Sequence, residues 1–311
     1  MSTTTGRREF LRAAAVTSAG LALAKRLPAA PAKSVLVFTK SSGFEHEVVK
    51  RIDGKPSLMD DTITTLGDEN GFHVGVTKDG RIFDEKKFHD YSALVFYTTG
   101  DLTKLGTDGK PPMSAEGKQN LLEAIHNGMG FVGIHAAADT FHPQPDPKDL
   151  SNRYIAHGEQ QDPYLKMLGA EFIIHGSNPR LQDASLIVND PKFPGLEGVS
   201  SPVSLKEEWY SLKDFQSDLH VILTLDTKGM HGACYERAPY PVTWARMYGR
   251  GRVFYTAIGD RPENWKNEFF TKLLGGGIRW AIGDVNPNVE TNLKEAVPGY
   301  AEIPPREPAK N

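Results

Sequence analysis

The stretch that most constrains the fold runs from Gly128 to Thr140, with the sequence Gly-Met-Gly-Phe-Val-Gly-Ile-His-Ala-Ala-Ala-Asp-Thr. A short apolar run framed by glycines ends on His135 and passes into an alanine-rich segment. This pattern is typical of a buried parallel strand that turns sharply into a helix. It also has the form of a nucleophile elbow, with histidine in the place of serine or cysteine. Because ligands of open α/β sheets bind at the carboxyl ends of strands, the pattern predicts that His135 faces a site.

Apolar runs alternate with helical patterns over the first half of the chain, which indicates βαβ units and a parallel sheet. Beyond residue 170 the patterns favour strands, until a last helix. A long polar loop over 140–162 is predicted beside the elbow, a place where long loops commonly act as lids. The predicted strands are 34–39, 72–77, 93–97, 131–135, 186–188, 208–210, 221–225, 242–245 and 252–256, and the predicted helices are about 58–69, from near 114, and about 267–282.

The first 32 residues differ in composition from the rest. Paired arginines, Arg7 and Arg8, precede a short alanine- and leucine-rich run and small-residue cleavage sites. This order is typical of a secretory signal, and the arginine pair resembles a twin-arginine export signal. We therefore expect residues 1–32 to be a signal peptide and the mature chain to be periplasmic or secreted.

Composition excludes several classes of function. A net charge of −3 argues against nucleic-acid partners, and no apolar run is long enough for a membrane anchor. The single cysteine, Cys234, excludes an internal disulfide and a multi-cysteine metal site. Cys234 is also remote from the elbow, and no Gly-x-Ser-x-Gly motif occurs, so cysteine-dependent glutamine amidotransfer and serine-type hydrolysis are disfavoured.

Polar residues that follow the predicted strands are the candidates for a site, because strand ends line the crevice of an α/β sheet. Asp139 lies four residues after His135, so in an α-helix both would share one face and the carboxylate could orient the imidazole. The candidates at strand ends are Lys40, His46, Thr99, Asp101, His135, Asp139, Asp260 and Arg261.

A metal site is the competing hypothesis for these residues. His46, His135 and a carboxylate such as Glu208 would suit zinc or another divalent ion. The sequence contains no compact ligand motif, so no cofactor is predicted, and a divalent metal stays an alternative.

Five ordered segments resemble the ThuA-like (trehalose utilisation) family: 35–46, 128–140, 207–210, 241–259 and 275–283. The resemblance implies one domain over 34–283, followed by a polar, proline-rich tail over 284–311. It implies a flavodoxin-like fold of the class I glutamine amidotransferase-like type, without the elbow cysteine. Such a fold has a mostly parallel sheet with helices on both faces, and the β-rich second half would form excursions around it.

The resemblance also implies a small-molecule carbohydrate as partner, in disaccharide or 3-keto-glycoside breakdown. Matched to the family's motifs, the site candidates are His46, His135, Asp139, Glu208 and Tyr210. The chain has Asp260 after Gly259 and Phe193 before Pro194, where family members usually show histidines. Asp260 could still act as a ligand or base.

Our leading hypothesis is an exported hydrolase, lyase or isomerase in which His135 acts with Asp139 or Glu208 in acid/base chemistry. One alternative is a non-catalytic sugar-binding module that stacks sugar rings on Trp209, Tyr210 or Trp244, although strand aromatics more often belong to the core. The other is a metal-dependent hydrolase that uses His46 and His135.

Overall fold

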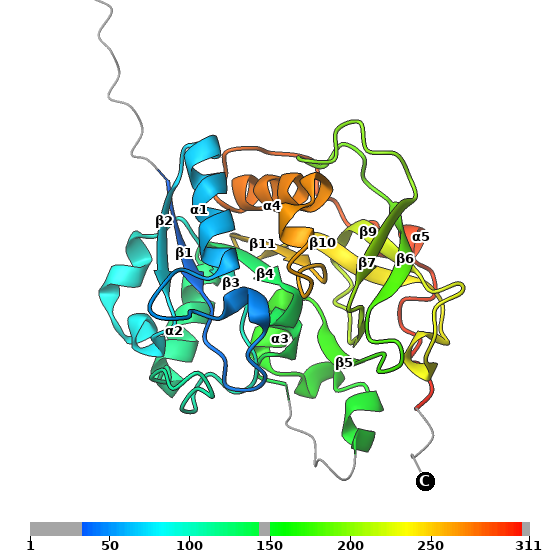
Figure 1. The fold of residues 1–311 in the computed structure, drawn as a ribbon, viewed down its shortest axis with the longest axis horizontal. Coiled ribbons are helices and arrows are strands. Elements are labelled where there is room, and N and C mark those ends of the chain that lie inside the picture. Colours follow the sequence, from blue (N-terminus) through cyan, green and yellow to red (C-terminus); the bar gives the residue numbers. More distant parts are fainter. Residues whose placement is uncertain (1–32, 143–149, 307–311) are drawn as a thin grey trace, which may run out of the picture. The chain divides into compact units, whose positions relative to one another are not determined.

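The computed structural model describes residues 33–142 and 150–306, and within them a nine-stranded sheet forms the centre of the fold (Figure 1). The strand order is β2-β1-β3-β4-β11-β10-β9-β6-β7, and two further strands, β5 and β8, form a small antiparallel sheet. The strands are β1 (Ser34–Phe38), β2 (His73–Thr77), β3 (Ala93–Phe96), β4 (Gly130–Ile134), β5 (Glu171–His175), β6 (Gln182–Val188), β7 (Val203–Glu207), β8 (Tyr210–Lys213), β9 (His220–Asp226), β10 (Tyr240–Tyr248) and β11 (Gly251–Thr256).

The parallel half of the large sheet runs from β2 to β11 and confirms the predicted flavodoxin-like fold. All pairs from β2 through β1, β3 and β4 to β11 are parallel. This strand order is that of flavodoxin, with its first crossover point between β1 and β3. Every residue of β3 and β4 is buried, as expected of strands that are covered on both faces.

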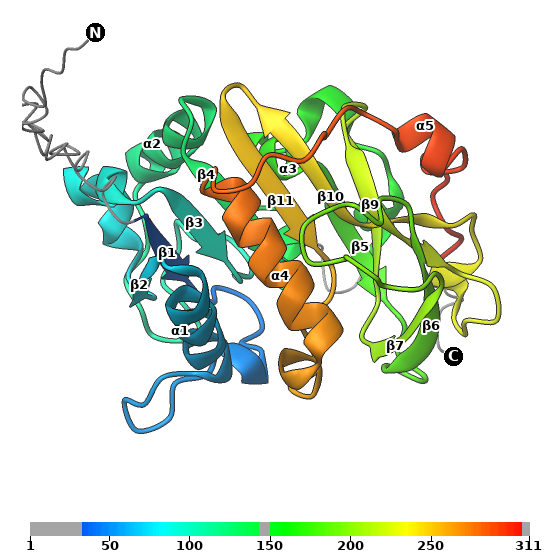
Figure 2. The same cartoon turned by 90° about the horizontal axis from the view of Figure 1, so that it is seen from above.

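The helices are α1 (Leu58–Asn70), α2 (Ala115–His126), α3 (Pro163–Leu168), α4 (Glu268–Ala281) and α5 (Leu293–Ala296). α1 packs against α4, whereas α2 packs against α3, and Figures 1 and 2 show these two pairs on opposite faces of the sheet. Right-handed crossovers explain this, because α1 leads from β1 to one side of the sheet and α2 leads from β3 to the other.

Local sequence signals set the helix ends close to the predicted positions. Ser57 caps α1 in a capping box with Asp60, and Gly71 ends the helix in the left-handed conformation. Ser114 caps α2 by accepting a hydrogen bond from the amide of Gly117. In α4, Gly276 permits close packing, since a Cβ there would collide with the carbonyl of Pro194.

The antiparallel half of the sheet corrects one predicted strand. The segment 208–210 is not one strand, because β7 ends at Glu207 in the large sheet and β8 begins at Tyr210 in the small sheet. Glu208 and Trp209 therefore lie where the chain leaves one sheet for the other. We call residues 207–210 the sheet junction. β5 and α3, which the pattern did not predict, complete the packing around it.

The described part of the C-terminal tail is packed onto the domain. Leu293 and Val297 are buried, and the side chain of Asn292 bonds to both the amide and the carbonyl of Val221 in β9. The predicted signal peptide over 1–32, and residues 143–149 of the predicted long loop, lie outside the described residues. Among the described helices, none combines the length and the apolar character needed to cross a bilayer.

Candidate functional site

A cavity of about 780 Å³ opens at the carboxyl ends of the parallel strands, where the strand pattern predicts a site. Residues that follow β1 and β11 meet residues of the sheet junction at its wall. The cavity is lined by Phe44, His46, Glu47, Asp139, Arg153, Phe172, Ile174, His175, Arg180, Leu181, Glu208, Tyr210, Asp260, Arg261, Pro262 and Glu263.

His135 lies directly behind this wall, completely buried, at the end of β4. Its φ of +43° is in the left-handed region that a histidine rarely adopts, in agreement with the elbow-like pattern. Tyr255 donates a hydrogen bond to the carbonyl of His135, at 2.9 Å, and the His135 Nδ1 lies 2.8 Å from the carbonyl oxygen of Ala257. A carbonyl can only accept, so Nδ1 carries a proton and Nε2 is the free end of the ring.

The free Nε2 of His135 points toward Glu208 of the sheet junction. It is buried without a hydrogen bond and lies 3.6 Å from Glu208 Oε1. Burial by itself lowers the pKa of His135, but the carboxylates of Glu208, Glu207 and Asp260 outweigh it and raise that pKa. In the opposite direction, His135 and Arg180 outweigh the burial of Glu208 and lower the pKa of its carboxyl to about 2. Both shifts favour the ion pair of imidazolium and carboxylate.

His46 is the second histidine of the site, and it is held neutral. Its ring lies edge-on to the ring of His135, with centroids 5.4 Å apart. Burial and the neighbouring His135 lower the pKa of His46 to about 3. Its Nε2 lies 3.5 Å from the Tyr210 hydroxyl and 4.0 Å from Asp260 Oδ1, and its buried Nδ1 has no hydrogen-bond partner.

Arg180 joins the two cavity carboxylates. Its Nη1 donates to Glu208 Oε2 at 2.6 Å and to Asp260 Oδ2 at 2.8 Å. The other oxygen of each carboxylate faces the histidines. One ligand atom from each of His46, His135, Glu208 and Asp260 thus lies within 4.8 Å of the other three.

Glu207 fixes the turn that presents Asp260, a role that sequence reasoning missed. Its buried carboxylate accepts hydrogen bonds from the amides of Gly259, Arg261 and Glu208 and from the side chain of Asn264, at 2.8–3.1 Å. Burial raises the pKa of this carboxyl. The adjacent pair Glu207-Glu208 was the available signal, since neighbouring residues of an extended segment point to opposite sides.

Several predicted site residues come together, and three do not. The structure gathers His46, His135, Glu208, Tyr210, Asp260 and Arg261, with Asp139 also at the cavity. Lys40 is instead buried and donates to the Lys110 carbonyl at 2.7 Å. Thr99 bonds to the Phe44 carbonyl, and Asp101 accepts from the amide of Thr103. These three side chains shape neighbouring loops and do not line the cavity.

Asp139 is not the partner of His135, contrary to the four-residue spacing argument. The segment His135–Asp139 is a 3-10 helix with about three residues per turn, so residues four apart no longer share a face. Asp139 contacts His142, three residues further on. Glu208 takes the predicted place of Asp139 beside His135.

The two positions at which the chain departs from the family's usual histidines have different surroundings. Asp260 lies in the cluster of potential ligand atoms. Phe193 is in the core, with its ring stacked on Phe254 at 5.7 Å. Trp209 and Trp244, candidates for sugar stacking, are fully buried and donate to the carbonyls of Gln182 and Leu168. They are core residues.

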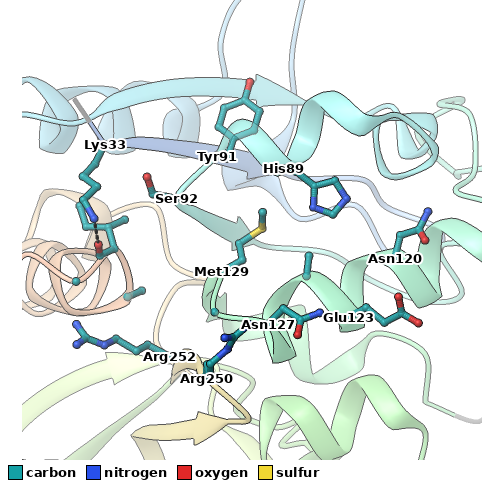
Figure 3. A pocket seen from close by; sticks show the side chains of 15 residues that line it. Lys33, His89, Tyr91, Ser92, Asn120, Glu123, Asn127, Met129, Arg250 and Arg252 are labelled. Carbon is teal, nitrogen blue, oxygen red and sulfur yellow. Dashed lines mark hydrogen bonds between the residues drawn. The ribbon is translucent and has the colours of Figure 1, made fainter. Parts of the chain in front are cut away.

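A second cavity, of about 600 Å³, lies at the opposite end of the sheet, near the starts of β3, β4 and β11 (Figure 3). Lys33, Arg250 and Arg252 give it a basic lining. Lys33 donates to the Ile282 carbonyl at 2.8 Å, and Arg252 to the Trp280 carbonyl at 3.1 Å. Because helices end in unpaired carbonyls, the end of α4 explains Lys33 and Arg252. The histidine–carboxylate cavity is therefore the candidate site.

Comparison with known proteins agrees with this fold. The model of the ThuA family, described as trehalose utilisation, matches residues 34–281. A ThuA-like protein from Bacteroides uniformis is similar in structure, with a TM-score of 0.57, 19% identity and coverage of 82% of this chain and 95% of that one. Another from Parabacteroides merdae has a TM-score of 0.55 and 16% identity, covering 88% and 97%. At these identities the likeness concerns the fold alone.

A search of curated proteins finds no significant match. The family model nevertheless covers most of the chain, including β1, the elbow with His135, the sheet junction and α4. The chain therefore belongs to the ThuA (trehalose utilisation) family.

Proposed function

We propose that the chain is an exported enzyme of carbohydrate breakdown in which His135 and Glu208 perform the acid/base chemistry. The observation that carries this proposal is the buried, unbonded Nε2 of His135, 3.6 Å from Glu208 Oε1 at the wall of the large cavity. The cavity volume of about 780 Å³ suits a disaccharide, since small-molecule sites span about 300–1,000 Å³. Membership of a trehalose utilisation family supports a carbohydrate as substrate.

In this mechanism Glu208 meets the substrate and His135 holds the proton behind it. Nδ1 of His135 stays bonded to the Ala257 carbonyl, so proton exchange takes place at Nε2. When a bound substrate draws Arg180 away from Glu208, the pKa of that carboxyl rises and it takes the proton from His135. Glu208 then delivers the proton to the departing glycosidic oxygen, while a water molecule adds to the sugar carbon and returns one proton through Glu208 to His135.

The test compares His135→Gln and Glu208→Gln with the wild type on glycosides and 3-keto-glycosides. We expect turnover to be lost while sugar binding persists. Glu236→Gln, at an exposed position outside the cavity, is the matched control and should turn over normally. If no variant and no wild-type sample turned over any of these sugars while all bound them, the sugar-binding module would replace the enzyme.

A metal-dependent hydrolase is the second candidate, favoured by the four ligand atoms within 4.8 Å of one another. Two imidazoles and two carboxylates form a donor set that zinc accepts. The bond from His135 Nδ1 to a backbone carbonyl is the support that metal-bound imidazoles usually have. A bound divalent ion would supply Lewis acidity and activate water. His46, His135, Glu208 and Asp260 would hold it, with Arg180 bonded to the outer carboxylate oxygens.

Elemental analysis of protein purified without added metal or chelator tests this second candidate. A metal site predicts about one equivalent of a divalent ion, and a melting temperature that rises with added zinc. His46→Gln and Asp260→Asn should abolish both effects. A metal-free protein whose melting temperature does not respond to zinc would exclude this candidate and leave the acid/base pair.

Export is tested separately from catalysis. Residues 1–32 fused to a reporter that is active only after twin-arginine export should direct it out of the cytoplasm. Replacing Arg7 and Arg8 by lysine should stop export. A reporter that is exported equally well without the two arginines would contradict the twin-arginine assignment.

A further inference from the structure

We propose that Phe44 is the platform on which an uncharged sugar ring of the substrate lies, in the subsite beside the catalytic centre. This inference rests on the proposed carbohydrate function and specifies the substrate class. Its structural basis is an aromatic ring at the cavity that is exposed to solvent and carried by a hydrogen-bonded loop.

Phe44 is exceptional among the exposed apolar side chains of the described residues. It is 70% exposed and lines the cavity. Among the large apolar side chains of the described residues that are exposed, it is the one aromatic. The others, none of which lines the cavity, are Ile52, Val76, Leu105, Leu150, Ile155, Ile187 and Met247. Burying a phenylalanine is worth about 1.5–3 kcal/mol, so stability does not explain the exposed ring.

Hydrogen bonds hold the loop that carries Phe44. Thr99 Oγ1 donates to the Phe44 carbonyl at 2.9 Å and accepts from the Gly43 amide at 3.2 Å. Thr107 Oγ1 donates to the Gly43 carbonyl at 2.6 Å. The backbone on both sides of the ring is thus fixed, and a ligand that stacks on the ring meets a surface that is already in place.

The ring also lies beside the catalytic centre. The centroids of Phe44 and His46 are 5.0 Å apart, edge to face, and those of His46 and His135 are 5.4 Å apart. Phe44, Glu208 and Asp260 all line the same cavity. A sugar that covers the face of Phe44 would therefore place its neighbouring glycosidic bond toward the carboxylates.

The charges of the cavity favour an uncharged sugar. Its lining includes five carboxylates, from Glu47, Asp139, Glu208, Asp260 and Glu263, and three arginines, Arg153, Arg180 and Arg261. Arg180 is bonded to Glu208 and Asp260, and Arg261 to Glu263. Because the cations are largely occupied and the acids are in excess, a sugar phosphate or sugar acid would be repelled. The flat apolar face of a neutral pyranose matches an aromatic ring with polar groups around it.

Calorimetric titration of the full chain with trehalose, 3-keto-trehalose, sucrose and cellobiose tests this platform, with trehalose 6-phosphate as the charged counterpart of trehalose. The titrations are made in the His135→Gln background, so that binding is measured without turnover and all five cavity carboxylates stay in place. We expect Phe44→Ala to weaken binding of the best neutral sugar about tenfold, and Phe44→Trp to restore it. Ile52→Ala, which removes an equally exposed side chain outside the cavity, should leave affinity unchanged.

Unchanged affinity in Phe44→Ala would overturn the proposal, as would tighter binding of trehalose 6-phosphate than of trehalose, or binding of none of the neutral sugars. These results are distinguishable from failure of the proposed enzyme. Binding that depends on Phe44, without turnover by the wild type, would keep the platform and reject catalysis. Turnover that does not change in Phe44→Ala would reject the platform and keep the enzyme.

Discussion

The parallel and antiparallel halves of the large sheet contribute different groups to one cavity. The parallel half places His46, His135 and Asp260 after β1, β4 and β11, as expected of strand ends. The antiparallel half contributes Glu208 at the end of β7 and Arg180 just before β6. The ring of His135 is positioned by its hydrogen bond to the Ala257 carbonyl, whereas Glu208 of the antiparallel half brings a charge that acts on the pKa of both histidines.

The pKa values of the two histidines, His46 and His135, are shifted in opposite directions. Burial lowers the pKa of His46 to about 3, whereas carboxylates that include Glu208 and Glu207 raise the pKa of His135, which is buried equally well. The same residue type, in the loop after β1 and at the end of β4, thus acquires pKa shifts of opposite sign. The sheet junction supplies Glu207 and Glu208, two of the carboxylates that raise the pKa of His135. Mutations of the junction should therefore change this pKa most clearly.

The largest expected effect comes from Glu208→Gln, which removes the carboxylate of the antiparallel half that faces His135 of the parallel half. Loss of the acid/base partner should lower kcat about 10²–10⁴-fold. The pKa of His135 should also fall, because burial is then opposed by fewer carboxylates. Imidazole NMR titration measures this fall, with Glu236→Gln as the control. A fully active variant, or an unchanged His135 pKa, would show that the two halves are not coupled through Glu208.

Glu207→Ala should have the next largest effect, on stability. It leaves the amides of Gly259, Arg261 and Glu208 without their acceptor. The Asn264 side chain loses one of two acceptors, because it keeps the Lys206 carbonyl. Buried donors without partners cost about 1–3 kcal/mol each, and with local relaxation we expect a loss of about 3 kcal/mol in the free energy of unfolding. Urea denaturation measures this loss, and Glu236→Ala should stay close to the wild type. A loss below about 1 kcal/mol would mean that the turn carrying Asp260 does not depend on the junction.

Arg180→Ala should have a smaller effect, visible mainly in the pH profile. The arginine is half exposed, so solvent screens its ion pairs, and we expect kcat/KM to change about tenfold or less. Because Arg180 helps to lower the pKa of Glu208, its removal should move the acidic limb of the profile to higher pH. Arg180→Lys should restore part of the shift. If the acidic limb did not move in Arg180→Ala, the conclusion would be that Arg180 does not lower the pKa of Glu208.

The parallel half could largely be predicted from the sequence, because its signals are local. Continuous apolar runs predicted β1, β3 and β4, and capping residues predicted the ends of α1 and α2. The glycine-framed run also located His135 at a strand end. In the antiparallel half, the change of sheet between Glu207 and Tyr210 has no local signal, and the pattern merged the two strand ends into one predicted strand.

The site was predictable where a residue lies at or soon after the end of its strand. His135 follows β4 directly, Asp260 lies four residues after Thr256 of β11, and His46 lies eight residues after Phe38 of β1. Glu208 was suggested by a family resemblance, and its contact with His135 depends on packing between the two halves. Arg180, Glu207 and Phe44 were missed because exposure and long-range hydrogen bonds define their roles. The predicted pairing of Asp139 with His135 was wrong for a local reason, since a 3-10 helix replaces the expected α-helix, although Asp139 does line the cavity.

His220, on β9 in the antiparallel half, offers the smallest and most selective test. It bonds to Asp190 at 2.9 Å and to the Glu290 carbonyl of the tail at 2.7 Å. Burial lowers its pKa, but these two partners outweigh burial and raise it. The raised pKa means that the stabilisation is fully present below the unfolded value of about 6.5 and is lost as pH rises through the folded value.

We therefore expect His220→Gln to cost about 1 kcal/mol of unfolding free energy at about pH 5.5, and clearly less at about pH 9. Urea denaturation at both pH values measures the difference, and kcat should not change, because His220 does not line the cavity. An equal cost at both pH values would show that His220 acts only through packing. A pH-dependent loss of unfolding free energy with unchanged kcat would show that the charged pair of His220 on β9 holds the tail. Control of catalysis by charged pairs of the antiparallel half would then be confined to the sheet junction.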